Sequence, residues 1–345
     1  MNTRGGDIAG STSEPEIKRM LEVTMENGKR VVSINFSSMD IIMTCLRKAQ
    51  YVLRDGLQAM ESGAAVTFGK GIHKALEIFY AYPREQRSLP PRYKENILLL
   101  CMGQELECPE KDHFIYDATR GFINDVGTVL DGLPDTDKRS KANGAWLLGD
   151  YFESRINDPY EVVVRDGIPM VEQLFELTVH EDDDLIIRAF GTIDAILENK
   201  ANGSLVVCDH KTTSAQYLGD FYNRTKPNHQ YTLYTWLAQE CLGLNTESFL
   251  INVFQVKPKP KTSRGKGADF LWIPTRRTPE DIAEFKESLV YYVRQYLHCL
   301  DTDVWPIGTP NACANYGACT FLKVCSSPKS IRPAILQHEY KKRGE

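Results

Sequence analysis

The chain has 345 residues, of which 42% are hydrophobic and 25% charged, and its formal net charge at pH 7 is −5. A chain of this length and composition can bury a full hydrophobic core, which excludes disorder over most of it. The acidic balance excludes a protein that coats nucleic acid by bulk electrostatics but leaves room for a local basic groove. The sequence has no run of about 18 apolar residues and no apolar signal-peptide core, so we expect a cytoplasmic protein without a membrane anchor. In that compartment the nine cysteines are thiols or metal ligands rather than disulfides.

The N-terminal region begins with polar residues rich in Gly and Ser, which predict a flexible lead-in over residues 1–30. Residues 31–345 are expected to form a single domain. Its first helix is predicted to start at residues 37–40 (SSMD), a capping-box pattern, and apolar side chains then recur at helical spacing as far as Leu53. This spacing places Cys45 on the apolar face of that helix.

Helical patterns continue beyond this first helix. A second helix is predicted over residues 69–82, where Pro83 ends the run. Residues 83–166 form a mostly helical stretch without a chemical motif, interpreted as an inserted layer that shapes substrate access. A last helix is predicted over residues 279–300.

Strand patterns begin after residue 170. They are predicted at residues 171–179, 185–190, 191–197, 205–210 and 249–256. A helix over residues 228–242, ended by Gly243, separates the last two of these strands.

The stretch 191–211 places two carboxylates and a lysine together. Its Asn-Gly pair at 202–203 lies between two strand patterns and is a strong hairpin signal. In such a hairpin Asp194 lies almost opposite Asp209, on the same face and at roughly 4.5–5.5 Å. The strand period of two adds Lys211 to that face. Two carboxylates can hold a divalent cation that activates water, and the ammonium can stabilise developing phosphoryl charge; the alternative is a solvated surface hairpin.

Four further residues are candidate partners of these groups. Gln230 and Tyr234 are four apart on the predicted helix and project from one face, which packs next to the strand of Lys211. An amide and a phenol there can hold a phosphate or stack on a base. His73 is a candidate nitrogen ligand for a metal, and Glu172, at the start of a strand, is a weaker candidate. The alternatives are a core Tyr234, a solvated Gln230 and a structural His73.

A basic loop follows the last predicted strand. Residues 257–266 (KPKPKTSRGK) carry five positive charges and no acid. Lys257, Lys259 and Lys261 are therefore candidate contacts to substrate phosphates, with an ordinary solvated loop as the alternative.

Three cysteines near the C-terminus, Cys313, Cys319 and Cys325, have five residues between each pair and lie in a loop-rich segment over residues 305–330. Such grouping indicates a metal centre that needs a fourth ligand, and Cys45 is the best placed. Structural zinc normally uses tighter spacings, so a [4Fe–4S] cluster suits the pattern better, with zinc as the alternative. The other five cysteines are interpreted as buried or incidental thiols: Cys101, Cys108, Cys208, Cys241 and Cys299.

Taken in order, five features resemble the RecB-like branch of the PD-(D/E)XK nuclease superfamily: Gly69 to His73, residues 191–194 (GTID), residues 209–211 (DHK), Gln230 with Tyr234, and the split cysteine set. The chain is more closely similar to the iron–sulfur members, which include CRISPR adaptation nucleases, the nuclease domain of AddB, mitochondrial single-strand exonucleases and phage-encoded relatives. The resemblance covers residues 37–325. It departs from the pattern at Asp209, where relatives often have Glu, and in the wide spacing of the first two C-terminal cysteines.

The resemblance implies an α/β, restriction-endonuclease-like fold with a central mixed sheet flanked by helices. It also implies hydrolysis of DNA phosphodiesters with Mg²⁺ or Mn²⁺. Lys211 would position and activate water, and Gln230 and Tyr234 would contact the substrate strand. The implied metal ligands are the side chains of His73, Asp194 and Asp209 and the backbone carbonyl of His210.

The expected function is a metal-dependent exonuclease acting on single-stranded DNA in recombination, repair or phage DNA processing. Recombination or replication proteins are candidate partners, and the location is the cytoplasm, that of the host if a phage encodes the chain. A CRISPR-adaptation-like trimming nuclease is one alternative, although such proteins tend to be shorter and residues 83–166 are then unexplained. A non-catalytic DNA-binding or assembly module is the other. The intact set of His73, Asp194, Asp209 and Lys211 favours catalysis.

Overall fold

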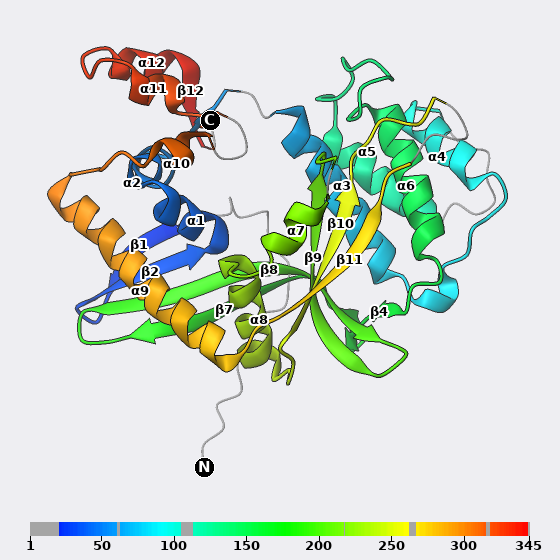
Figure 1. The fold of residues 1–345 in the computed structure, drawn as a ribbon, viewed down its shortest axis with the longest axis horizontal. Coiled ribbons are helices and arrows are strands. Elements are labelled where there is room, and N and C mark those ends of the chain that lie inside the picture. Colours follow the sequence, from blue (N-terminus) through cyan, green and yellow to red (C-terminus); the bar gives the residue numbers. More distant parts are fainter. Residues whose placement is uncertain are drawn as a thin grey trace. The chain divides into compact units, whose positions relative to one another are not determined.

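The computed structural model describes residues 21–60, 63–104, 113–216, 218–261, 267–314 and 318–343. The chain divides into two compact units, whose elements are labelled in Figure 1. Unit 1 comprises Met1–Ala59, Glu181–Ile187 and Tyr292–Glu345, and unit 2 comprises Met60–His180 and Arg188–Tyr291.

Eight strands form one mixed sheet in the order β1-β2-β8-β9-β10-β11, with β4 and β7 also paired to β8. β9 runs antiparallel to β8 and parallel to β10, which makes the sheet mixed. With helices packed against it, this sheet confirms the predicted α/β fold class. The strands are β1 (Leu21–Glu26), β2 (Lys29–Asn35), β4 (Tyr160–Val162), β7 (Val171–Glu181), β8 (Leu185–Asn199), β9 (Ser204–Thr213), β10 (Ser248–Gln255) and β11 (Phe270–Arg276).

The predicted hairpin is formed by β8 and β9. Gly203 has φ +70°, the left-handed conformation that its turn requires. The register runs from Asn199 opposite Ser204 to Ala195 opposite Cys208, so Asp194 and Asp209 are next in line. The two strands predicted over 185–190 and 191–197 are one continuous strand.

In unit 2, helices cover both faces of β9. The Tyr80 ring of α3 (Ala64–Ala81) stacks on His210 with centroids 5.4 Å apart, whereas Gln230 of α8 (His229–Leu242) donates to Asp209. Adjacent residues of a strand point to opposite faces, so α3 and α8 lie on opposite sides of the sheet. Gly243 ends α8 with φ +63°, as predicted.

The stretch predicted as a helical layer over residues 83–166 contains three helices, α4 (Tyr93–Cys101), α5 (Phe114–Val126) and α6 (Lys141–Arg155). They pack on one another, and α5 and α6 also contact α3 (Figure 1). The rings of Phe79, Phe114 and Phe152 are fully buried between these helices. The stretch is not helical to its end, because β4 follows α6 and joins the sheet. Shorter elements of unit 2 are the 3-10 turn η2 (Arg84–Gln86), strands β5 (Val164–Arg165) and β6 (Ile168–Pro169), and helix α7 (Gly219–Asn223).

Unit 1 begins earlier than predicted. β1 and β2 pair antiparallel within and just after the stretch expected as a flexible lead-in over residues 1–30, so that expectation was wrong for residues 21–30. Residues 1–20 lie outside the described residues. Most of β1 is exposed, yet its sequence alternates apolar and polar residues and is followed by Asn27-Gly28, so a hairpin signal is present there that the composition-based expectation of a flexible lead-in passed over.

The first helix of unit 1 differs from its prediction in both its cap and its length. α1 (Phe36–Thr44) is capped by Asn35, whose side chain accepts from the Ser38 N–H at 2.9 Å, rather than by the SSMD pattern. Cys45 then adopts an extended backbone, with φ −164° and ψ 111°, between α1 and α2 (Leu46–Ala49). Cys45 therefore lies at a break between helices and not on the face of one continuous helix.

The remaining elements of unit 1 lie directly after α2 or in the last part of the chain. The π-helix η1 (Gln50–Arg54) continues from α2, and β3 (Leu57–Ala59) pairs antiparallel with β12 (Tyr340–Lys342). α9 (Pro279–Thr302) begins in unit 2 and ends in unit 1, and it extends two residues beyond its predicted end. The cysteine segment contains α10 (Pro310–Ala314) and α11 (Leu322–Ser326), followed by α12 (Arg332–Glu339). Within the described part of the chain, no helix is long and apolar enough to span a bilayer.

Candidate active site

A buried ion pair occupies the end of β9. Asp209 is 1% exposed, and its Oδ2 lies 2.7 Å from Nζ of Lys211, which also donates to Oδ1 at 3.0 Å. Nε2 of Gln230 donates to the same Oδ1 at 3.0 Å. The strand period therefore brings Asp209 and Lys211 onto one face as the sequence predicts, and α8 adds the amide.

Three potential metal ligands converge beside this pair. Nδ1 of His73 lies 3.5 Å from Oδ2 of Asp194, and one carboxylate oxygen of Glu172 completes a group whose ligand atoms all lie within 4.8 Å of one another. The Oδ2 of Asp194 also accepts the backbone N–H of His210 at 2.7 Å. This hydrogen bond ties the Asp194 carboxylate directly to the Asp-His-Lys segment of β9.

Glu172, a weaker candidate from the sequence, belongs to this group. It is the second residue of β7, and its φ of +46° is uncommon for a residue with a side chain. Such a conformation costs on the order of 1–3 kcal/mol and persists where the surrounding structure holds it, often at functional sites. An acid at the start of a strand carries no sequence signal for this, because its approach to Asp194 depends on the pairing of β7 with β8.

The negative charges of the buried carboxylates favour a bound cation at this site. Burial is the main cause that raises the pKa of Asp209 to about 6; the Lys211 ammonium lowers it and the charge of Asp194 raises it further. One ammonium thus does not fully compensate the buried carboxylate. The converging donors, two carboxylates from Asp194 and Glu172 with the imidazole of His73, suit Mg²⁺ or Mn²⁺. Asp209, predicted from the sequence as a further ligand, is not part of this group and instead contacts Lys211 and Gln230.

Tyr234 lies against Gly191 on the same side of the sheet as Gln230. A Cβ atom at position 191 would come within 2.8 Å of Cε1 of the tyrosine ring. Burial is the main cause that raises the pKa of this phenol, with further contributions from the charges of Asp209 and Asp194. The structure thus places Gln230 and Tyr234 beside the carboxylates, where the four-residue spacing predicts them.

Beneath the site, a buried polar chain holds His210. Its Nδ1 lies 2.9 Å from Nδ2 of Asn252, which donates to the Tyr151 hydroxyl at 2.6 Å, and that hydroxyl lies 2.9 Å from the Tyr80 hydroxyl. Burial lowers the pKa of His210 to about 3, so the imidazole is neutral near pH 7. These contacts hold the His210 side chain on one side of β9, while its backbone N–H donates to Asp194.

In the described part of the basic loop, Lys257 approaches Asp269 at 3.6 Å, while Lys259 and Lys261 are exposed. The second half of the predicted loop, residues 262–266, lies outside the described residues.

The four cysteines of the predicted cluster all lie in unit 1 and are free thiols. Sγ of Cys45 accepts the Gly308 N–H at 3.3 Å, and a Cβ atom at Gly308 would lie 3.1 Å from that sulfur. The N–H of Cys319 donates to the carbonyl of Cys313 at 2.8 Å. The pKa of Cys325 is raised by burial first and then by the charges of Cys45 and Cys319, so these thiols lie near enough to interact.

The other described cysteines were interpreted as buried or incidental thiols. Cys101, Cys208 and Cys299 are buried, whereas Cys241 is exposed, with its Sγ donating to the Glu176 carbonyl. Cys108 lies outside the described residues.

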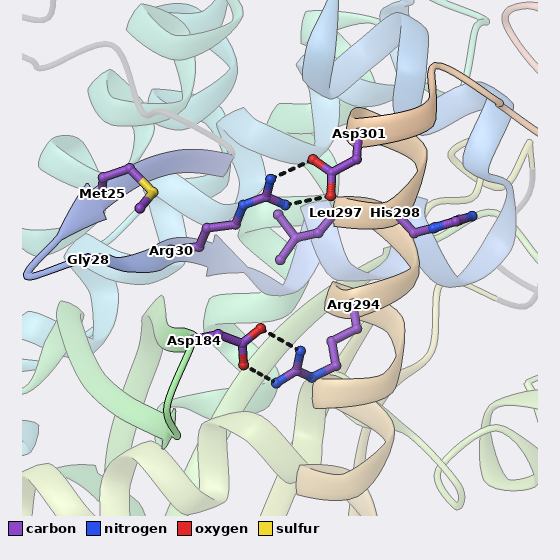
Figure 2. Close-up of a pocket in the computed structure, with 8 residues that line it drawn as sticks. All are labelled: Met25, Gly28, Arg30, Asp184, Arg294, Leu297, His298 and Asp301. Atoms are coloured by element: carbon purple, nitrogen blue, oxygen red, sulfur yellow. Dashed lines mark hydrogen bonds and ion pairs between the residues drawn. The ribbon is translucent and has the colours of Figure 1, made fainter.

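A pocket of about 390 Å³ lies in unit 1, between the β1–β2 hairpin and the end of α9 (Figure 2). Arg30 faces Asp301, with Nη1 donating to Oδ2 at 2.9 Å, and Arg294 faces Asp184, with Nη2 donating to Oδ1 at 3.0 Å. Both arginines are committed to carboxylates, so we assign this pocket no role in holding phosphate.

The arrangement on β8 and β9, Asp194 followed by Asp209-His210-Lys211, is shared with a known family. The model described as the PD-(D/E)XK nuclease superfamily matches residues 33–326. The chain belongs to the PD-(D/E)XK nuclease superfamily. The superfamily match includes both the Asp194 to Lys211 hairpin and the span from Cys45 to Cys325. The comparison with curated proteins gave no match. Membership in the superfamily implies a nuclease, and it agrees with the observed mixed sheet and with a site able to hold Mg²⁺ or Mn²⁺.

Proposed function

We propose that this protein is a Mg²⁺- or Mn²⁺-dependent exonuclease that hydrolyses phosphodiester bonds of single-stranded DNA. The observation that carries the proposal is the joining of Asp194, Asp209 and Lys211 at the end of one hairpin. The choice of single strands and of a role in recombination, repair or phage DNA processing rests on the resemblance of the cysteine set to iron–sulfur exonucleases.

The proposed metal ligands are the side chains of His73, Glu172, Asp194 and Asp209, with the backbone carbonyl of His210. A divalent cation bound there would polarise the phosphodiester and lower the pKa of a water molecule. The Asp194 carboxylate is already oriented by the His210 N–H at 2.7 Å, so little reorganisation is needed to bind the ion.

Lys211 is proposed to orient the attacking water and to stabilise the negative charge that develops on the phosphate. The water oxygen forms a bond to phosphorus and the bond from phosphorus to one sugar oxygen breaks. One water proton is lost to solvent, and the leaving oxygen takes up a proton. Gln230 donates to Asp209 and holds that carboxylate in place, and Gln230 and Tyr234 are proposed to border the substrate strand.

We also propose that Cys45, Cys313, Cys319 and Cys325 bind a [4Fe–4S] cluster in unit 1. The spacing of five residues between successive C-terminal cysteines is wider than the roughly two to four usual for structural zinc, which favours the larger cluster. The Gly308 N–H aimed at Sγ of Cys45 is the kind of donor that stabilises cluster ligands.

The proposed activity is tested by digesting a 5′-labelled single-stranded oligonucleotide with Mn²⁺ or Mg²⁺, comparing wild type with Lys211→Ala on one gel. We expect progressive shortening by wild type and a loss of at least a hundredfold in rate for the variant, because a preorganised charge is removed from the transition state. Equal cleavage by both proteins would refute the site. Absence of cleavage by wild type would favour a binding module, and a single internal cut would replace the exonuclease assignment.

A further inference from the structure

The turn before α6 and the start of the basic loop each carry basic side chains and are joined by hydrogen bonds to Asn143. We propose that Lys138, Arg139, Lys259 and Lys261 bind the phosphate backbone of the substrate strand next to the active site. This inference rests on the proposed nuclease function and gives the helical stretch between residues 83 and 166 a direct role in binding substrate.

One buried side chain joins the two segments. Asn143 is 4% exposed, and its Nδ2 donates to the carbonyl of Lys138 at 2.9 Å and to that of Lys257 at 2.8 Å. Its Oδ1 accepts the Lys259 N–H at 2.8 Å. Three hydrogen bonds from one amide thus hold the loop after β10 against the turn before α6. Such a buried and satisfied amide fixes the relative position of both segments.

The loop also returns beside the same helix. A Cβ atom at Gly267 would lie 3.9 Å from Cζ2 of Trp146, on the second turn of α6. The described start and end of the loop are therefore both held next to α6, which restricts where its lysines can point.

The charges on this surface are largely uncompensated. In the described ranges no carboxylate forms an ion pair with the charged end of Lys138, Arg139, Lys259 or Lys261, whereas Lys257 approaches Asp269 at 3.6 Å. The carboxylate of Asp137 lies in the same turn, where it accepts the backbone N–H of Arg139 at 2.7 Å. Four cations without a carboxylate partner stand out in a chain of net charge −5. They match a polyanion, because each phosphate neutralised by a lysine or arginine releases bound counterions.

The surface lies beside the exit of the catalytic strand. Nη2 of Arg139 donates to Oγ of Ser214 at 3.5 Å, and Ser214 is three residues beyond Lys211. The backbone N–H of Val256 donates to the carbonyl of Thr213 at 2.6 Å, so the loop after β10 starts next to the same segment. Three extended residues span roughly 10 Å, which corresponds to a few nucleotides of a stacked strand. The basic surface can therefore hold nucleotides that flank the scissile bond.

The test compares wild type with the double variant Lys138→Gln/Arg139→Gln. A matched control, Arg165→Gln/Lys200→Gln, removes two charges from exposed side chains, one of which, Lys200, lies in the β8–β9 turn at the opposite end of β9 from Lys211. Binding of a fluorescein-labelled single-stranded 20-mer is followed by anisotropy in EDTA between 50 and 200 mM KCl, and cleavage by each protein is measured separately with Mn²⁺.

We expect the Lys138/Arg139 variant to bind roughly tenfold more weakly at 100 mM KCl. The slope of log K against log salt should fall by about 1.4, because a single strand releases about 0.7 counterion per contact, and the control should match wild type. Wild type that binds and cleaves, together with an unchanged slope in the variant, would overturn the inference and leave the nuclease assignment intact. Wild type that neither binds nor cleaves the oligonucleotide would overturn both this inference and the proposed nuclease function. An equal loss of affinity in the control variant would mean that binding depends only on overall charge, and it would also overturn the inference.

Discussion

Asp209 is a buried acid whose negative charge is not fully compensated by the protein groups around it. Lys211 and Gln230 contact it, yet burial still holds its pKa near 6. A carboxylate poised in this way gains most from a bound cation. A bound cation would relieve the free-energy cost of ionising Asp209, and this gain would add to the affinity for metal.

The pKa of Asp209 predicts a pH-dependent gain in stability for Asp209→Asn. Its folded pKa, about 6, lies above the unfolded value of 3.8, so the folded state binds more protons between these values and loses stability as pH rises through this window. At pH 7.5 in EDTA the variant should be more stable by at most about 3 kcal/mol, since each pKa unit corresponds to 1.36 kcal/mol. Calorimetry or thermal CD from pH 3.5 to 8 measures this, and the difference should vanish near pH 3.5.

Asp125→Asn, at an exposed position of α5, provides the control for that experiment and should show no such pH dependence. Millimolar Mg²⁺ or Mn²⁺ should reduce the difference in free energy of unfolding between Asp209→Asn and wild type, because the ion stabilises wild type alone. If Asp209→Asn were less stable than wild type at pH 7.5 without metal, Lys211 would compensate the carboxylate fully and the argument for an incomplete site would fail.

Residues of the site were predictable where they depend on local spacing. Asp194, Asp209 and Lys211 follow from one hairpin turn and the strand period, and Gln230 and Tyr234 from one helical turn. The part played by Glu172 was not predictable in this way, because it requires β7 to pair with β8 and a left-handed backbone at a residue with a side chain.

Among the secondary-structure elements, α8 shows how a glycine in one strand positions a helix. The absence of a side chain at Gly191 lets the Tyr234 ring lie directly on β8, and the same helix then brings Gln230 to Asp209. The glycine in the Gly-Thr-Ile-Asp motif therefore acts by allowing close approach and not by an unusual backbone angle.

Gly191→Ala is predicted to disable the site while leaving the protein folded. The new methyl group would lie 2.8 Å from Cε1 of Tyr234, so the ring and its helix must move. We expect a destabilisation of about 1–3 kcal/mol, typical of an overpacked core, and a loss of cleavage of tenfold or more. Urea unfolding and the oligonucleotide assay measure the two effects.

Gly132→Ala is the matched control, because a Cβ atom at Gly132 meets nothing within 4 Å. It should keep wild-type activity. Full activity of Gly191→Ala would show that Tyr234 and Gln230 need not keep their observed positions for cleavage.

The elements that sequence reasoning missed have different causes. β1 carries a readable signal, with Leu21, Val23 and Met25 alternating before an Asn-Gly turn, whereas β11 contains Pro274, which weakens a strand pattern and is tolerated at the edge of a sheet. The break at Cys45 contains neither glycine nor proline and is stabilised by tertiary contacts such as the Gly308 N–H. Local propensity gives way to tertiary packing at such positions.

For the whole molecule, the two proposed centres belong to different compact units. The thiols lie in unit 1 and the candidate nuclease residues lie in unit 2. Mixed-sheet topology could be expected from the order of strands and helices, but the division into units could not. Unit 1 is assembled from three separate segments, and no composition shift in the sequence marks their boundaries.

Cys45→Ser is predicted to remove the cluster and loosen unit 1. Wild type purified under anaerobic conditions should be brown, absorb near 400 nm and contain about four irons per chain, whereas the variant should be pale. Hydrogen exchange should rise in residues 21–59 and 292–343 and change little in residues 60–180, because metal binding is coupled to the folding of its own ligand segments.

Cys241→Ser, at an exposed thiol of unit 2, is the control and should keep both colour and protection. A colourless wild type with one zinc per chain would replace the cluster by zinc. Full protection of unit 1 in the colourless Cys45→Ser protein would mean that this unit does not depend on its thiols.

The composition of unit 1 from both early and late parts of the chain has a consequence for biosynthesis. Its first strands leave the ribosome some three hundred residues before Cys325, whereas all of unit 2 is translated in between. The nuclease residues can therefore reach their places during translation, while the thiols can meet only after the last of them has emerged. Delivery of iron and sulfide would then be the final step of maturation, and a ribosome stalled before residue 313 would carry a folded hydrolytic unit without its cluster.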